Sequence, residues 1–169
     1  ADEPYSWDTS VEKTDKESFN VENYIDGIEI PWGMWFLPNE DLLVSDRNGT
    51  LWQIKKDGKT KKKISGVPKV KYKGQGGLLD VLFDNEQVYI SYSENRGDWK
   101  TSTSVAKGKF DNENIEFNNI FRAEPPIDSG YHFGSRLVIK DNHLYITAGE
   151  RGKGMIAQDV KQHPGSTVS

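Results

Sequence analysis

Apolar residues recur along the chain in short runs with the two-residue period of β-strands, and Gly, Asn, Asp or Pro residues separate the runs. No window of ten or more residues has the apolar spacing of an amphipathic helix, so the pattern predicts an all-β fold. Asn48-Gly49 lies between two of the runs and is typical of a two-residue hairpin loop. The predicted strands are residues 19–24, 33–37, 41–46, 50–55, 78–84, 87–94, 103–110, 136–140 and 143–148.

Three of the predicted strands repeat one pattern, in which three apolar residues precede a hydroxyl. The pattern reads Leu-Leu-Val-Ser at 42–45, Val-Tyr-Ile-Ser at 88–91 and Leu-Tyr-Ile-Thr at 144–147. The hydroxyl positions are 46 and 56 residues apart, close to the repeat length of a four-stranded β-propeller blade. A β-sandwich also contains repeated short strands. The repeat favours a β-propeller with about three blades in this chain, whereas known propellers close with about 4–8 blades.

Charge and composition exclude several classes of function. The 169 residues carry 22 Lys and Arg against 26 Asp and Glu, a net charge of −4, and include no cysteine. A mildly acidic chain lacks the positive field of a nucleic-acid clamp, and a chain without cysteine has no disulfide, thiolate zinc site or cysteine nucleophile. No run approaches the ~18 apolar residues of a membrane span.

Residues 1–18 are polar and without period, and we expect them to form a flexible N-terminal tail ahead of one propeller-type unit at 19–169. A loosely docked strand is the alternative for these residues. The first residues, Ala1-Asp2-Glu3-Pro4, would suit a mature end left by signal-peptide cleavage, which predicts a periplasmic or secreted location. An arbitrary chain boundary is the alternative.

Two glycine-rich segments carry candidate chemistry. Gln75 lies among three glycines, a composition that favours tight turns and close approach to another group, although an ordinary inter-strand loop is the alternative. His132 lies between aromatic residues and glycines just before a predicted strand. The ordinary pKa of histidine, about 6.5, suits proton transfer near neutrality, and a structural histidine is the alternative.

A third segment, Gly-Glu-Arg-Gly at 149–152, directly follows a predicted strand. Loops at strand ends of repeat folds gather on one face, so Glu150 could orient a histidine from a neighbouring loop. The alternative is a Glu150–Arg151 pair on a solvated loop. No metal ligands are assigned, because the three histidines lack close metal-binding spacing.

Taken in order, these motifs resemble the soluble quinoprotein glucose dehydrogenase family, most closely its bacterial aldose sugar dehydrogenase branch. Pro-Trp-Gly-Met-Trp-Phe-Leu-Pro at 31–38 resembles the family's Pro-Trp-Gly-Met-Ala-Phe-Leu-Pro, and Gly-Gln-Gly-Gly-Leu-Leu-Asp at 74–80 matches throughout. Residues 130–138 resemble Gly-Gly-His-Phe-Gly-Ser-Arg-Leu-Val, and 149–152 resemble Gly-Asp-Arg-Gly. The resemblance covers about residues 19–168.

The resemblance implies a six-bladed β-propeller that binds pyrroloquinoline quinone (PQQ) and calcium and oxidises aldoses at the anomeric carbon to lactones. It implies that His132 is the catalytic base and lies beside the quinone, that Glu150 orients it, and that Gln75 contacts cofactor or substrate. Glu150 stands where the family usually has an aspartate, and Tyr131 where the glucose dehydrogenases have one. The family chain is about twice as long, and its second half holds the calcium ligands and the residues that grip the quinone.

The sequence therefore predicts the first half of a PQQ-dependent aldose dehydrogenase that passes electrons to an external acceptor. We expect its open blades to pair with a second half or a second copy to close the propeller. The alternatives are a non-catalytic calcium- or sugar-binding propeller module and a calcium-dependent lactonase propeller.

Overall fold

The computed structural model describes residues 10–169, which form three antiparallel sheets and one short hairpin. The first sheet contains β3 (Pro31–Phe36), β4 (Leu42–Asp46), β5 (Thr50–Ile54) and β6 (Lys61–Ile64). The second contains β7 (Leu78–Asp84), β8 (Gln87–Asn95), β9 (Thr101–Lys109) and β10 (Asn118–Arg122). The third contains β11 (Gly134–Lys140), β12 (His143–Ala148) and β13 (Ser166–Val168).

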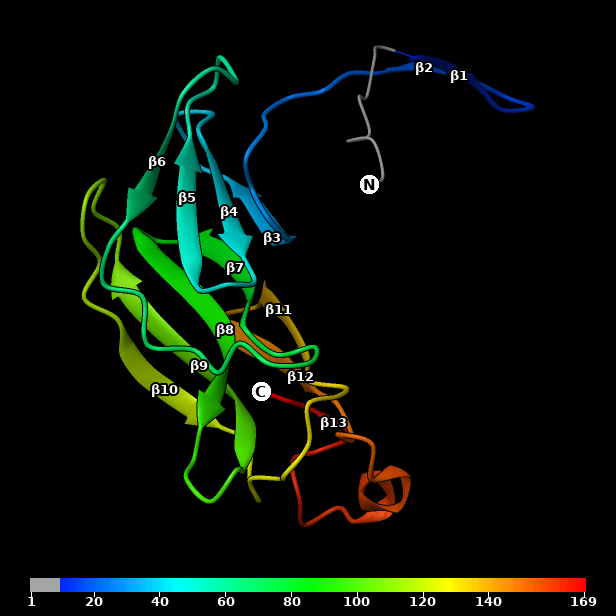
Figure 1. Ribbon diagram of the computed structural model, residues 1–169, viewed down its shortest axis with the longest axis vertical. Helices are drawn as coiled ribbons and strands as arrows, with labels where there is room; N and C mark the ends of the chain where they lie inside the picture. Colours follow the sequence, from blue (N-terminus) through cyan, green and yellow to red (C-terminus); the bar gives the residue numbers. More distant parts are fainter. Residues whose placement is uncertain (1–9) are drawn as a thin grey trace, which may run out of the picture.

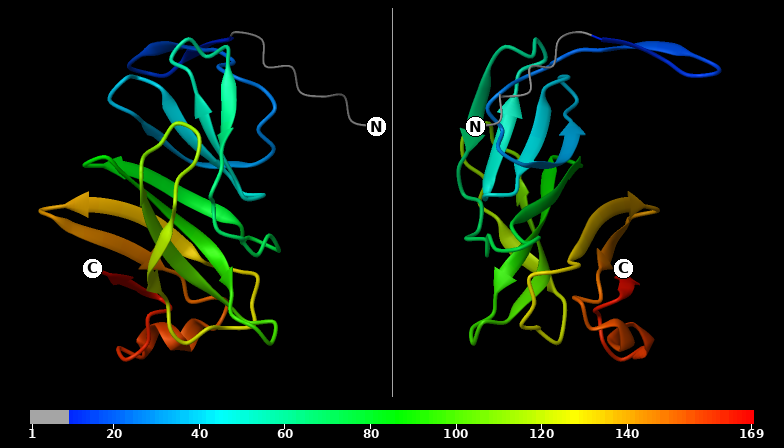
Figure 2. Two further views of the ribbon diagram at one scale, coloured as in Figure 1. Left: turned by 90° about the vertical axis from the view of Figure 1, so that its left-hand side faces the viewer. Right: turned by 45° about the vertical axis from the view of Figure 1, so that its right-hand side comes forward.

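Each sheet is a meander in which consecutive strands pair, and the sheets lie beside one another in chain order (Figures 1 and 2). Strand β7 contacts β3 and β4 of the first sheet and β11 of the third. The described residues therefore form about three blades of propeller type, as the repeat predicted. The helical residues among them are the 3-10 segment η1 (Gly154–Gln158). Between residues 10 and 169 no helix has the length and apolar character that crossing a bilayer requires.

Each predicted strand overlaps an observed one, with bounds that differ by up to three residues, and β7 and β12 agree residue for residue. Three strands within 19–169 were not predicted, because their sequences lack an apolar alternation: β6, β10 and β13. Strand β6 reads Lys-Lys-Lys-Ile, and Lys61 and Lys63 place their ammonium groups about 5.0 Å and 5.3 Å from the ring of Trp52. Cation–π contact thus lets lysines occupy this strand.

The predicted tail falls partly outside the described residues, which begin at Ser10. From there β1 (Ser10–Lys13) pairs with β2 (Ser18–Val21), so the predicted boundary at residue 18 lies within a hairpin. The hairpin extends away from the three sheets (Figure 1).

Apolar side chains fill the spaces between the blades. Strand β4 is buried along its whole length because both of its faces are covered. Its Leu43 packs between the first and second blades, whereas Leu42 and Val44 pack on the other face against Ile25 and Ile28. A second cluster, which includes Leu82 and Leu137, lies between the second and third blades. The core is therefore shared between neighbouring blades.

The repeated hydroxyl joins each blade to the next. The pairing register shifts in the first strand of each blade, beside the hydroxyl of the second strand. The shifted backbone N–H donates to that hydroxyl: Gly33 N to Ser45 Oγ (2.9 Å), Asp80 N to Ser91 Oγ (2.8 Å) and Arg136 N to Thr147 Oγ1 (2.9 Å). The serine hydroxyls in turn donate to the next blade, Ser45 to the carbonyl of Leu79 and Ser91 to that of Ser135 (2.6 Å).

A buried carboxylate reinforces the junction between the second and third blades. Asp80 is 3% exposed, and its two oxygens accept hydrogen bonds from Arg136 Nη1 (3.0 Å) and Leu137 N (2.8 Å). Burial raises the pKa of Asp80, and these hydrogen bonds oppose the rise. The Arg136 guanidinium lies 4.9 Å from the ring of Trp32, which brings the first blade into the same contact. A Cβ on Gly33 would lie 2.7 Å from Asp80 Oδ1, so only glycine fits there.

We predict that Ser91→Ala destabilises the protein by about 1–3 kcal/mol, because it leaves the buried N–H of Asp80 and the carbonyl of Ser135 without a partner. Urea unfolding measures the change. Ser18→Ala, at an exposed position of β2, is the control and should leave the midpoint unchanged. Equal midpoints for the two variants would contradict the role of the hydroxyl.

Candidate functional site

The three residues singled out in the sequence lie on loops that meet at one end of the second and third blades. Gln75 precedes β7, His132 precedes β11 and Glu150 follows β12. Strands β11 and β12 pair with Gly134 opposite Ala148, so the loops carrying His132 and Glu150 are neighbours. Gln75 reaches the same place because its N–H donates to the carbonyl of Gly130 (2.8 Å). The structure therefore brings all three residues together.

His132 and Glu150 form a close pair. His132 Nδ1 lies 2.5 Å from Glu150 Oε1, with the side chains 53% and 27% exposed. The hydrogen bond from His132, with a second from Gly152 N, lowers the pKa of Glu150, so its carboxylate is an acceptor at neutral pH. Nδ1 is then the donor, which leaves His132 Nε2 as the nitrogen that can accept a proton.

The backbone around His132 is held in an uncommon conformation. His132 has φ of 50°, in the left-handed region that few residues other than glycine adopt. Its carbonyl lies against Gly149, where a Cβ would collide with the carbonyl oxygen. Gly149 N also donates to the carbonyl of Phe133 (3.1 Å). The absence of a side chain at Gly149 therefore lets the loop of His132 approach the loop of Glu150.

Gln75 positions His132 directly. Its Oε1 accepts a hydrogen bond from the backbone N–H of His132 at 2.8 Å. The carbonyl oxygen of the side chain is thus occupied, and Nε2 is the atom that can donate to a ligand. The residue is exposed, as a ligand contact requires.

Arg151 holds the loop that precedes His132 in place, a role that the sequence did not reveal. It does not pair with Glu150 on a solvated loop, which was the alternative considered above: it is 3% exposed. Its guanidinium donates hydrogen bonds to the carbonyls of Tyr131 (2.8 Å), Thr101 (3.0 Å) and Ser129. It also donates to Thr101 Oγ1 (2.6 Å). The guanidinium lies 3.7 Å from the centre of the Phe133 ring. Burial lowers the pKa of Arg151 to about 10, which leaves it charged at neutral pH.

The described residues contain no cluster of titratable metal-binding side chains. Between residues 10 and 169 no three His, Cys, Asp or Glu side chains converge closely enough to hold one. The family resemblance places the calcium ligands in a part of the family chain that these residues do not include, and calcium stays a prediction.

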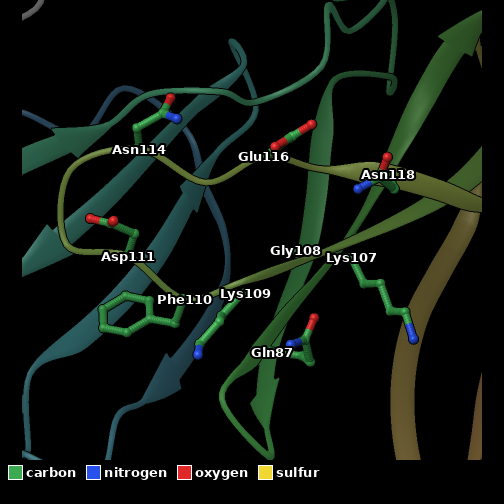
Figure 3. Close-up of a pocket in the computed structure, with 9 residues that line it drawn as sticks. All are labelled: Gln87, Lys107, Gly108, Lys109, Phe110, Asp111, Asn114, Glu116 and Asn118. Carbon is green, nitrogen blue, oxygen red and sulfur yellow. The ribbon is translucent and has the colours of Figure 1, made fainter.

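A hollow of about 540 Å³ lies on the described surface (Figure 3). It is lined by Gln87 at the start of β8, by Lys107 and Lys109 at the end of β9, and by the connection to β10. Because Gln87 pairs with Lys109 and Asn95 pairs with Thr101, the hollow and the Arg151 contact lie at opposite ends of β8 and β9. The hollow contains neither His132 nor its partners.

We predict that His132→Ala raises the pKa of Glu150 toward its ordinary value of 4.5, because the largest cause of its depression is removed. Carbon-13 NMR of the glutamate carboxyls measures it, with Glu150→Gln identifying the signal. Since the folded-state pKa is depressed, the pair stabilises the protein above pH 4.5 and loses this effect as the pH falls through the folded-state pKa. An unchanged Glu150 titration in the variant would refute the assigned pair.

We predict that Arg151→Met destabilises the protein by about 3 kcal/mol or more, because several backbone carbonyls lose the charged donor that Arg151 supplies from a buried position. Urea unfolding measures the loss, and hydrogen exchange should show faster opening of residues 129–133. Lys153→Met, at an exposed position two residues further on, is the matched control. Similar stability of the two variants would rule out the support role.

Comparison with known proteins places this chain in a family. The Glucose / Sorbosone dehydrogenase family matches residues 28–169. The chain is 37% identical over 161 residues to aldose sugar dehydrogenase YliI of Escherichia coli (strain K12), with 88% of this chain and 43% of that protein covered.

Solved structures agree. A glucose dehydrogenase crystal structure superposes with a TM-score of 0.80 at 35% identity, covering 85% of this chain and 44% of that one. The PQQ-bound form of aldose sugar dehydrogenase from Streptomyces coelicolor superposes with a TM-score of 0.76 at 26% identity, covering 95% and 48%. The chain thus spans less than half the length of these relatives. The motif resemblance is confirmed, and the chain belongs to the glucose/sorbosone dehydrogenase family.

Proposed function

We propose that this chain carries the proton-transfer part of a PQQ-dependent dehydrogenase that oxidises the anomeric carbon of aldoses to lactones. The observation that carries the proposal is the contact between His132 Nδ1 and Glu150 Oε1, which leaves Nε2 of an exposed imidazole as the acceptor. The S. coelicolor relative is described in its PQQ-bound form, which supports the same cofactor here.

His132 acts as the general base. Its Nε2 accepts the proton of the anomeric hydroxyl, while the hydride on the same carbon leaves and the C–O bond becomes the lactone carbonyl. The Glu150 carboxylate accepts the Nδ1–H and stabilises the positive charge that develops on the ring. Gln75 fixes the backbone of His132 through Oε1, so that the ring is held in place before the substrate arrives.

PQQ, when bound, supplies the acceptor for the hydride. Among the described residues, Nε2 of Gln75 would be suited to donate to an oxygen of this group, because Gln75 contacts the backbone of His132 through Oε1 alone. An external electron acceptor would be required to reoxidise this group. Calcium and a periplasmic or secreted location remain predictions.

Two exposed sheet faces suit the docking of further blades. Met34 and Phe36 of β3 are 67% and 64% exposed, and Val138 of β11 is 51% exposed. Apolar residues on a strand face favour burial against another sheet. These faces support the proposal that a second half or a second copy closes the propeller.

We predict that His132→Ala lowers sugar-dependent dye reduction by at least about 100-fold in the full-length protein loaded with PQQ and calcium, because the general base is lost. Glu150→Gln should lower it less, since the ring keeps its place but loses the carboxylate. Initial rates with several aldoses measure both.

His143→Ala is the matched control, because His143 is exposed at the first position of β12 and its replacement should leave the rate unchanged. A wild-type protein that reduces no dye with any aldose would contradict the proposal and favour the non-catalytic sugar-binding module. Lactone hydrolysis without PQQ would favour the lactonase.

A further inference from the structure

Trp99 is exposed to solvent at the tip of the hairpin between β8 and β9. The residue is 77% exposed, more than any other tryptophan among the described residues. Asp98 and Trp99 have φ of 46° and 64°, and Lys100 N donates to the carbonyl of Gly97 (2.8 Å). Positive φ at both central residues makes this a type I′ turn, whose second central position favours glycine.

The position of Trp99 therefore costs free energy for two reasons. A bulky side chain in the left-handed region strains the backbone, and an apolar ring gains no burial here to offset it. Strained residues cluster at ligand-binding places, where the strain presents a side chain.

The ring borders a small hollow that continues into the His132 loop. Trp99 lines it together with Lys71, Lys73, Asp128, Gly130 and Phe133. Gly130 also receives the hydrogen bond from Gln75 N. The tip is tied to the site from the other side, because Thr101 accepts from Arg151. Hydrogen bonds from Arg151 and the shared hollow thus connect the loop of His132 to the hairpin of Trp99.

The chemistry around the ring suits a carbohydrate. Within residues 10–169 none of Lys71, Lys73 and Asp128 takes part in an ion pair, so all three can contact a ligand. An aromatic face bordered by donors and acceptors matches a sugar ring, which has an apolar C–H face and a rim of hydroxyls. The hollow, about 30 Å³, holds little more than one water molecule. A sugar ring would therefore lie on the face of the indole and not inside the hollow.

We propose that Trp99, with Lys73 and Asp128, forms an outer subsite for the second sugar ring of a saccharide whose reducing-end ring lies at His132. The inference rests on the proposed function and names its substrate class: reducing disaccharides and longer saccharides are bound better than monosaccharides.

The test compares Trp99→Gly and Asp98→Gly in the full-length, cofactor-loaded protein. Both changes place glycine in a left-handed position and relieve strain, so neither should lower the unfolding temperature, but only the first removes the indole. With maltose, Trp99→Gly should raise KM about tenfold at unchanged kcat. With glucose, both constants should stay unchanged. Asp98→Gly should behave as wild type, and Trp99→Tyr should restore most of the affinity.

Maltose binding without turnover is followed by tryptophan fluorescence, and Trp99→Gly should abolish the change. Equal maltose-to-glucose KM ratios in wild type and Trp99→Gly would overturn the subsite while leaving the proposed function intact. A wild-type protein that oxidises neither sugar would overturn the proposed function. In that case a maltose-induced fluorescence change that depends on Trp99 supports the subsite, and its absence overturns it.

Discussion

The hydroxyl of the second strand in each blade is the contact on which the arrangement of blades depends. A shift of register in a strand leaves one N–H and one carbonyl without their ladder partners. Ser91 satisfies both kinds of group, since it accepts from Asp80 in its own blade and donates to Ser135 in the next. The donor and the acceptor belong to different blades, so the hydroxyl fixes the position of one blade along the other. Apolar packing alone is not directional and would allow the blades to slide.

The same junction sets the position of the site. Ser135, which receives the Ser91 hydroxyl, lies three residues after His132, and Gly134 pairs with Ala148, two residues before Glu150. A displacement of the third blade would therefore move His132 away from Gln75, which belongs to the second blade. The catalytic candidates are held at a boundary between blades, where one chain segment can supply the imidazole and another its hydrogen-bond partners.

The sequence predicted those parts of the fold in which local pattern and packing agree. Strand β7 is apolar over most of its length, and its bounds were predicted to the residue. Strand β6 was missed because its lysines lie on Trp52, a contact between strands that a single segment cannot reveal. The role of Arg151 was not predicted for the same reason. Most of its partners are backbone carbonyls, those of residues 101, 129 and 131, and carbonyls leave no signature in the sequence.

Glu150 and Arg151 are adjacent in the chain but serve different parts of the site. Arg151 has a positive φ of 61°, which reverses the direction of the backbone at this point. The side chain of Arg151 is buried among backbone carbonyls, whereas that of Glu150 contacts the partly exposed His132. A pKa of about 10 keeps the guanidinium charged throughout the range in which an imidazole ordinarily exchanges a proton. The loop that carries the imidazole is thus held by a buried positive charge whose partners include the backbone carbonyls of that loop.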